Sequence, residues 1–407
     1  MKKTILILAA VLIVVGGFLT WNQRNDATAA PAPAATPAPS PAAEAAEPAE
    51  AEPTPAIPEV HGLDYEALHA LHADDETVVT LAGQTADWKL FYDMLHSYGL
   101  QVEDYFAQMA SYYQIAPDWN GSAGNGMSFA QYVSDQAKSD LTSMLLIRAF
   151  SAEHGVTLGE AELEALTPDA LAAKVLGEGA TVEDLRETLE SRVHMKLENY
   201  VETAVASALF RKCYTELYGE NGEKISEEDA VAYLEDQDYL SAAHILLMTI
   251  DPMTGETLDD ETVAQKKAQA AALVEELRAI EDREALLKRF AELKEQYCED
   301  GGKVSYPDGY TFTPGTMVKE FENAVLALEN YGVSDPVESS YGLHIILRLP
   351  LSGESLLYSS KGTPSTAREE MAVTHFTADV DGFLSEHPAE FAADLENLDL
   401  TQYVKAD

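Results

Sequence analysis

The chain has 407 residues, of which 46% are hydrophobic and 8% aromatic, a composition typical of a globular protein with two or three domains. Its charge is unusual, because 70 acidic residues oppose 26 basic residues and give a formal net charge of −44. Nucleic-acid binding needs clustered Lys and Arg, so this charge balance excludes nucleic acid as a partner.

The N-terminus carries an apolar segment. Lys2 and Lys3 precede Thr4–Trp21, a run without a charged residue that is long enough to cross a bilayer as a helix. Residues 1–25 are therefore either a membrane anchor or a signal peptide, with a small-residue cleavage motif at Ala27–Ala29. We favour an uncleaved anchor, since that motif lies far beyond the apolar run. Both alternatives place the rest of the chain outside the cytoplasm.

Residues 26–59 are rich in Ala, Pro and Glu and contain almost no large apolar side chain. Such a segment cannot bury a core, so we expect a disordered linker. Its prolines make it a semi-rigid extended spacer.

Residues 60–238 have the apolar periodicity of a mostly helical domain. Glu227–Asp229 place acidic side chains in the first turn of one helix, as the helix dipole favours. In chain order we expect a strand over 76–81, a helix beginning near Trp88, a loop at 117–126, a helix over 129–152, two short helices within 158–176, one long helix over 182–217, and a helix that begins at Ser226.

From residue 239 the pattern changes to alternating strands and helices. This β-α-α-β-α-β-β order over 239–352 predicts a compact α+β domain with a four-stranded sheet. A tail over 353–407 follows. The expected elements are strands at 241–250, 309–313, 333–337 and 344–349, helices at 259–280, 283–297 and 318–329, and, in the tail, a helix over 367–383 and a segment over 395–403.

Three segments of the α+β domain resemble one family in the family's own order. Ala242–Leu246 is similar to an A-x-H-I-L strand, and Phe312–Ala324 to F-x-x-G-x-M-x-x-x-F-E-x-A. Gly332–Ile346 is similar to G-x-x-S-x-P-V followed by G-x-H-I-I. Together they resemble the parvulin-type peptidyl-prolyl cis/trans isomerases over roughly residues 240–350.

The flanking segments resemble the larger envelope foldases of the PrsA and SurA kind. Glu76–Tyr92 is similar to their opening V-x-V-N-G element, although Ala82 replaces the Asn. The resemblance implies that the tail, 353–407, packs on the helices of 60–238. It therefore implies a parvulin-like domain inserted in a mostly helical, chaperone-like module.

The chemistry of prolyl isomerisation requires no broken bond and no metal or cofactor. The barrier to rotation about a prolyl amide is about 18–20 kcal/mol, and the uncatalysed turnover takes tens of seconds or longer. The planar amide is more polar than the twisted one, so an apolar pocket that holds the proline ring favours the transition state.

The resemblance implies which residues form such a site. The substrate-binding residues would be Met317, Phe321, Tyr310 and Phe312, and the catalytic group would comprise His244, Asp300, His344 and Ser339. Taken alone, Met317 and Phe321 are also an ordinary i, i+4 core pair on a short helix. The two histidines would form the floor of the site and orient polar groups rather than exchange protons.

The sequence departs from the family pattern at several positions. Val318 stands where many members have Gln, and Tyr341 where some have Ser. The loop over 251–260 contains no Lys or Arg, so a preference for phosphorylated residues before proline is not expected.

Two cysteines, Cys213 and Cys298, are far apart in the sequence with no local cysteine framework. We expect unpaired thiols, although an oxidising compartment would permit one disulfide. Cys298 lies two positions before Asp300 and is not expected to be a nucleophile.

The expected function is an isomerase that acts on proline-containing, unfolded or exported polypeptides. It would be anchored at the outer face of a bacterial cell membrane or, if the N-terminal segment is cleaved, secreted or located in the cell envelope. The alternative is a client-holding chaperone with a weak or inactive parvulin domain. The presence of both histidines with Met317 and Phe321 favours activity, and Val318 leaves room for the alternative.

Overall fold

The computed structural model describes residues 57–124, 126–358 and 364–406. The predicted anchor and most of the linker lie outside this range, and none of the described helices is long and apolar enough to cross a membrane. The chain divides into two compact units, one formed by Met1–Cys213 with Thr377–Asp407 and the other by Tyr214–Phe376. The boundaries predicted at 238/239 and 352/353 stay predictions, because the compact units divide inside two helices, α8 (Leu197–Tyr218) and α13 (Ala367–Glu386).

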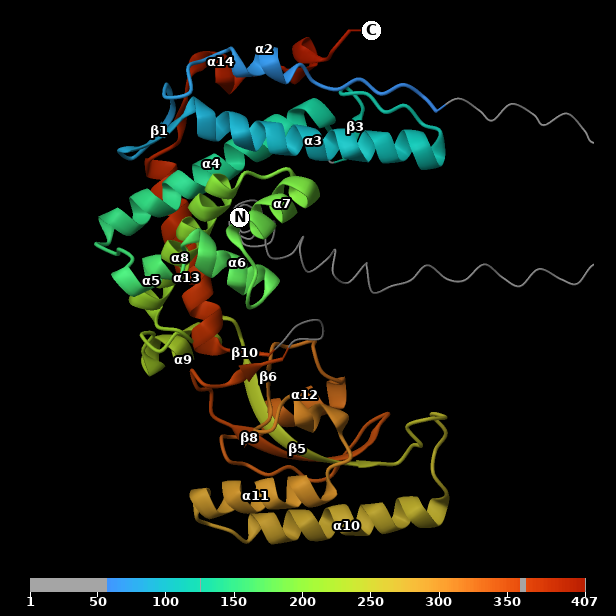
Figure 1. The fold of residues 1–407 in the computed structure, drawn as a ribbon. Coiled ribbons are helices and arrows are strands. Elements are labelled where there is room, and N and C mark those ends of the chain that lie inside the picture. Colours follow the sequence, from blue (N-terminus) through green and yellow to red (C-terminus); the bar gives the residue numbers. More distant parts are fainter. Residues whose placement is uncertain (1–56, 125, 359–363, 407) are drawn as a thin grey trace, which may run out of the picture. The chain divides into compact units, whose positions relative to one another are not determined.

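The first unit is mostly helical, as expected. Its longest helices, α3 and α4, pack against each other (Figure 1). Both begin at side-chain caps, Asp87 for α3 and Ser128 with Gln131 for α4. The elements are α2 (Tyr65–His69), β1 (Thr77–Leu81), β2 (Gln84–Asp87), α3 (Trp88–Tyr113), β3 (Ser122–Gly124), β4 (Met127–Ser128), α4 (Phe129–Glu153), α5 (Glu160–Glu164), α6 (Pro168–Leu176), α7 (Val182–Val193), the start of α8, the end of α13, β11 (Glu390–Phe391), α14 (Ala393–Glu396) and a short 3₁₀ helix, η2 (Leu400–Tyr403).

The end of the chain joins this unit through its backbone. Strand β11 pairs with β1, with Phe391 opposite Val79. Lys138 Nζ donates a hydrogen bond of 2.8 Å to the carbonyl of Glu396. These contacts support a module assembled from both ends of the chain, and its chaperone role stays a prediction.

The structure has two helices, α7 and α8, where the sequence predicts one. The prediction of a single helix over 182–217 is wrong, because His194 adopts a left-handed conformation with φ 53° and ends α7. Its ring Nε2 lies 2.7 Å from Asp104 Oδ2, which holds the turn in place. Helix α8 then begins at Leu197. Glycine is the usual residue at such a helix end, so no residue type in this stretch signals the break.

The second unit is an α+β structure around a six-stranded sheet of order β10-β9-β6-β5-β8-β7. The sheet is wider than the four strands expected, because two short strands from the tail extend one edge. The strand predicted over 333–337 is wrong in extent, since Val333 makes only an isolated bridge to Leu347. The elements are the end of α8, α9 (Glu227–Asp236), β5 (Leu240–Met248), α10 (Asp260–Arg278), α11 (Arg283–Tyr297), a 3₁₀ turn η1 (Gly301–Val304), β6 (Tyr310–Phe312), α12 (Lys319–Ala327), β7 (Val337–Glu338), β8 (Gly342–Leu349), β9 (Leu356–Leu357), β10 (Ser365–Thr366) and the start of α13.

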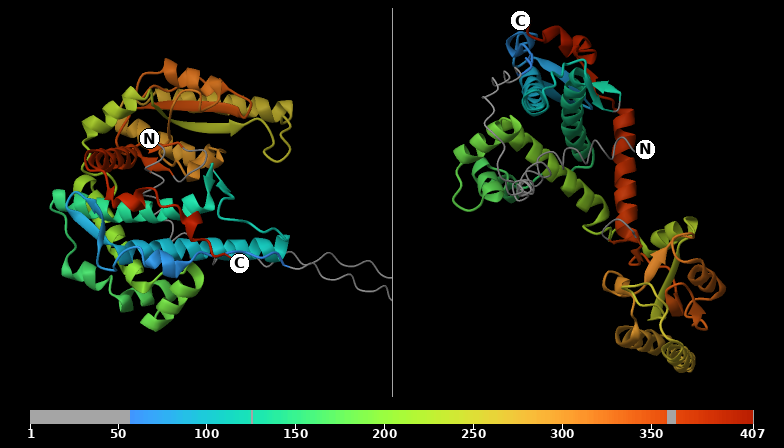
Figure 2. Two further views of the ribbon diagram at one scale, coloured as in Figure 1. Left: turned by 90° about the horizontal axis from the view of Figure 1, so that it is seen from above. Right: turned by 90° about the vertical axis from the view of Figure 1, so that its right-hand side faces the viewer.

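Helices cover both faces of this sheet (Figures 1 and 2). On one face, α10 and α11 bury Leu273 and Phe290 against Ile245 and Leu247 of β5. On the other face, α12 packs over a second cluster that includes Ala242. Because successive side chains of a strand point to opposite faces, β5 supplies both cores from a single buried sequence.

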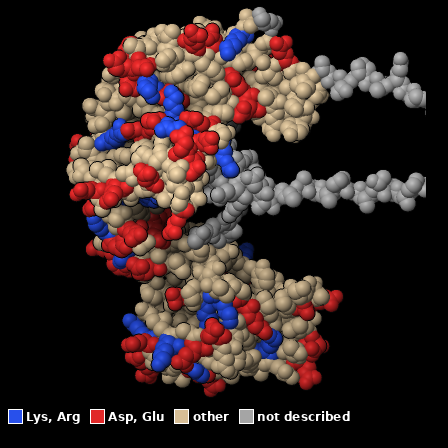
Figure 3. Space-filling model, in the orientation of Figure 1, with Lys and Arg blue, Asp and Glu red and all other residues tan. Residues whose placement is uncertain are grey.

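The surface reflects the charge of the chain. Figure 3 shows acidic side chains distributed over the visible face, with basic ones interspersed among them. Both cysteines are free, as the sequence predicts, and the structure shows that both are buried.

Candidate active site

The floor of the candidate site is a pair of histidines on neighbouring strands. His344 of β8 lies opposite Leu246 of β5, two residues from His244, so both rings emerge on the face that α12 covers. Their Nδ1 atoms are 3.1 Å apart, and the rings stack with centroids separated by 5.2 Å. Both residues are buried, with exposed fractions of 6% and 4%.

Hydrogen bonds extend this pair in both directions. His244 Nε2 lies 2.9 Å from Asp300 Oδ2, and the Tyr310 hydroxyl donates to the same oxygen over 2.5 Å. At the other end, Ser339 Oγ lies 2.7 Å from His344 Nε2. Five polar side chains from four separate segments thus form one continuous chain across the sheet.

One assignment of protons satisfies every link. Ser339 donates to His344 Nε2, His344 Nδ1–H donates to His244, and His244 Nε2–H donates to Asp300. Burial and the neighbouring His244 lower the pKa of His344 to about 4, so His344 is neutral at pH 7. These hydrogen bonds hold the two rings in place, and the expectation that the histidines orient polar groups rather than exchange protons stays a prediction.

Asp300 is the one carboxylate among these five hydrogen-bonded side chains. Burial would raise the pKa of its carboxyl, but hydrogen bonds from His244, Tyr310 and the backbone N–H of Gly302 outweigh burial and lower it. Burial and the Asp300 carboxylate together raise the pKa of Tyr310. At neutral pH the Asp300 carboxylate is ionised, and the Tyr310 phenol stays protonated and donates a hydrogen bond to it.

A cavity of about 320 Å³ opens above the histidines. Phe321 of α12 forms one wall, with its ring edge-on to His244 at a centroid distance of 5.3 Å. Met317 lies in the loop before α12, where its backbone N–H donates to Glu322 Oε1 over 2.8 Å. Gly315 N–H donates to the other oxygen of Glu322 over 3.0 Å, so one carboxylate fixes the loop. The lining residues are His244, Leu246, Met248, Asp300, Tyr310, Thr316, Met317, Val318, Phe321, Tyr341, His344 and Tyr358.

Two predicted site residues stand apart from the cavity lining. Ser339 is not among the lining residues, but its hydroxyl is hydrogen-bonded to two of them, His344 through Nε2 and Tyr341 through its backbone N–H. Phe312 is 1% exposed and packs behind Phe321, with ring centroids 5.8 Å apart, so the geometry gives it a supporting place instead of a substrate contact. The other predicted residues are brought together around the cavity: His244, Asp300, His344, Met317, Phe321 and Tyr310.

The sequence prediction missed some of the lining. Leu246 and Met248 follow His244 at intervals of two, so strand alternation alone would have found them. Tyr358 follows β9, beyond the expected end of the domain at residue 352, and its ring lies edge-on to Tyr310 at a centroid distance of 5.7 Å. No local pattern marked Tyr358, because its position depends on the edge strands of the tail.

Comparison with known proteins agrees with this geometry. Residues 244–349 match the family described as "Rotamase: PPIC-type PPIASE domain". This segment is thus similar in sequence to PPIC-type rotamase domains.

The chain is also similar to PrsA foldases. Foldase protein PrsA 1 of Bacillus cereus is 52% identical over 60 residues, which is 14% of this chain and 21% of that protein. Foldase protein PrsA of Halalkalibacterium halodurans is 31% identical over 172 residues, or 41% of this chain and 44% of that protein. The chain thus spans less than half of either relative. The crystal structure of a peptidylprolyl isomerase (PrsA) from Bacillus cereus covers 71% of this chain and 100% of its own, with 19% identity and a TM-score of 0.28.

Proposed function

We propose that the protein is a peptidyl-prolyl cis/trans isomerase that assists the folding of exported proteins. The observation that carries this proposal is the apolar cavity walled by Phe321 and Met317, whose floor is the hydrogen-bonded pair His244 and His344. Apolar walls of this size suit a proline ring, and a floor fixed by hydrogen bonds holds its shape while the substrate rotates.

The proposed mechanism is differential binding of a twisted amide. The apolar walls, with Leu246 and Met248, hold the proline ring and exclude water from the amide. Because the twisted amide carries less charge on oxygen than the planar one, it loses less on leaving water, and the cavity lowers the barrier. Asp300 and Tyr310 lie at the polar side of the cavity, where they would face the substrate backbone.

A second function is a client-holding chaperone in which this domain binds proline without efficient turnover. Val318 favours it, because this residue lines the cavity and offers no hydrogen bond to the substrate. The two functions share the binding step and differ in the rate of rotation.

The clients we propose are unfolded, proline-containing chains at the outer face of a bacterial cell membrane. The support is the apolar segment of residues 1–25, which would anchor or export the chain, and the Ala/Pro/Glu-rich spacer after it. The net charge of −44 supports the exclusion of nucleic acid as a partner.

The decisive experiment is a prolyl isomerisation assay on a panel of X-Pro peptides with residues 60–407. We expect acceleration over the uncatalysed rate that does not require an acidic residue before proline. Binding of the same peptides without acceleration would replace the isomerase by the client-holding chaperone. If the protein neither binds these peptides nor accelerates their isomerisation, both proposed functions are wrong.

A further inference from the structure

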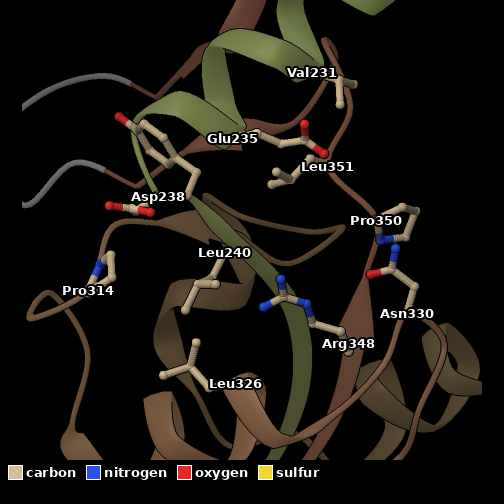
Figure 4. A pocket seen from close by; sticks show the side chains of 11 residues that line it. Val231, Glu235, Asp238, Leu240, Pro314, Leu326, Asn330, Arg348, Pro350 and Leu351 are labelled. Carbon is tan, nitrogen blue, oxygen red and sulfur yellow. The ribbon is translucent and has the colours of Figure 1, made fainter.

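A second cavity, of about 450 Å³, lies within the same unit at the far end of α12 (Figure 4). The loop before α12 borders both cavities, since Thr316 lines the first and Pro314 the second. Nothing in the isomerase chemistry uses this second cavity. It is lined by Val231, Glu235, Asp238, Tyr239, Leu240, Pro314, Leu326, Asn330, Arg348, Pro350 and Leu351.

Arg348 gives this cavity its chemistry. It lies on β8 opposite Ala242, on the same face of the sheet as His344. Figure 4 shows its guanidinium pointing from the strand toward Leu240. Its Nη1 atom is buried and has no hydrogen-bond partner among the residues that the structure describes. A buried donor without an acceptor is destabilising, and an occupant with a suitably placed oxygen would recover that loss.

The other residues that line the cavity indicate which kind of oxygen atom Arg348 would bind. Leu240 is buried at the base, whereas Leu326 is 61% exposed at the edge and available to an occupant. Glu235 and Asp238 also line the cavity and would repel a free anion such as phosphate. A neutral carbonyl oxygen satisfies Arg348 without that repulsion. The carboxylates and the Asn330 amide can accept backbone N–H groups, so the lining fits a peptide better than an ion.

We propose that this cavity binds an extended segment of the client chain, with Arg348 donating to a backbone carbonyl and Leu326 covering an apolar side chain. The identity of the occupant as a client rests on the proposed function. His344 and Arg348 are four residues apart on one strand, which is roughly 13 Å, so a client residue about four positions from the proline would reach the second cavity. The cavity would then select clients by sequence away from the proline.

The test uses the full-length protein in a mild detergent and two fluorescent peptides, a short one of about four residues around an Ala-Pro bond and a long one extended on both sides with leucines, each with blocked ends. We expect the long peptide to bind about tenfold more tightly by fluorescence anisotropy. Arg348→Met keeps the apolar stem and removes the donor, and it should abolish most of that difference. Leu326→Asp, at an exposed position, should do the same.

The matched control is Arg289→Met, on α11, where the side chain pairs with Glu276 and Glu292 outside the cavity. It should bind both peptides as the wild type does, and all variants should turn over the short peptide within about twofold of the wild type. Equal affinity of the wild type for both peptides, or a long-peptide preference that survives both Arg348→Met and Leu326→Asp, would overturn the proposal. A preference that appears only with a free terminal carboxylate would also overturn it, because the site would then be a receptor for chain ends.

The two proposals fail in different ways. If the wild type accelerates no isomerisation but shows a long-peptide preference that depends on Arg348, the isomerase function fails and the second cavity stands. If isomerisation is normal and Arg348→Met changes nothing, the second cavity alone fails.

Discussion

The two faces of β5 belong to one uninterrupted buried strand but have different roles. On the side of α10 and α11, Ile245 and Leu247 belong to a buried hydrophobic cluster. On the side of α12, His244 belongs to a polar chain beneath an open cavity. A one-residue shift of register would exchange the two faces, so the stability of the first face fixes the geometry of the second.

Burial alone does not mark the site. His244 and Ile245 are adjacent and almost equally buried. What distinguishes them is the side chain: the buried ring nitrogens of His244 and His344 need hydrogen-bond partners and have them, whereas Ile245 has no polar group to satisfy. Substitutions on the two faces should therefore separate activity from stability.

Phe321→Ala should have the largest effect. Removing this wall costs roughly 3–5 kcal/mol of stability, and the loss of the aromatic surface should remove most of the isomerase activity, because the apolar wall favours the twisted amide. The measurements are kcat/KM for an X-Pro peptide and circular dichroism of the same sample.

Met317→Leu is the control for that experiment. It keeps volume and apolarity, so it should cost less than about 1.5 kcal/mol and leave activity within a few fold of wild type. A folded Phe321→Ala protein with wild-type rate would show that Phe321 belongs to the core alone.

Acid should weaken the polar face before it weakens the apolar one. The pKa of His344 is about 4 in the folded protein against 6.5 for an unperturbed histidine, so the unfolded chain binds more protons between these values. Stability should therefore fall as pH falls from about 6.5 to about 4, by about 3 kcal/mol at most. The lowered pKa of Asp300 acts in a lower window, where stability is lost as pH falls below the usual Asp range.

Urea unfolding between pH 7 and 4 measures this slope. His344→Gln carries no titrating ring, so the fall across that window should shrink in this variant even if its stability at pH 7 is lower. If the free energy of unfolding of His344→Gln falls with pH as steeply as that of the wild type, other groups cause the acid sensitivity.

Ile245→Val tests the apolar face. Ile245 is 0% exposed, and loss of one methyl group there should cost about 0.5–1.5 kcal/mol. Because Ile245 points away from the cavity, kcat/KM should stay within about twofold of wild type. A large loss of activity at unchanged fold would mean that the two faces are coupled and not independent.

The smallest effect is expected from phosphorylating the residue before proline. The loop between β5 and α10 contains no Lys or Arg over residues 251–260, so no cation in it could pair with the phosphate. We expect kcat/KM for the phosphorylated peptide to be no higher than for the plain peptide. A gain of about tenfold would reveal a cation that this loop does not provide.

The sequence was sufficient wherever structure is local. Capped helices such as α4 and α11 begin at the expected residues, and the α+β order of the second unit is confirmed. The break at His194 was missed, because a left-handed histidine leaves no glycine to mark it. The edge strands β9 and β10 were missed because two residues carry no period to detect.

The candidate site likewise has residues that the sequence predicts and features that it does not. His244, Met317 and Phe321 lie in short motifs and were found through them, and the structure brings them together. Tyr358 and the hydrogen bond from Tyr310 to Asp300 depend on which segments meet in space. Pairwise geometry of this kind has no counterpart in a linear pattern, and neither does the second cavity, in which α9 meets the start of β5.

The outer strands of the six-stranded sheet have a consequence for a protein that would work among unfolded chains. Both edges, β7 and β10, are two-residue strands. A long bare edge would let any extended polypeptide add itself as a further strand, without regard to its sequence. Such short borders offer almost no backbone template, so an unfolded chain has little opportunity to pair with the sheet edge and be retained there as a further strand.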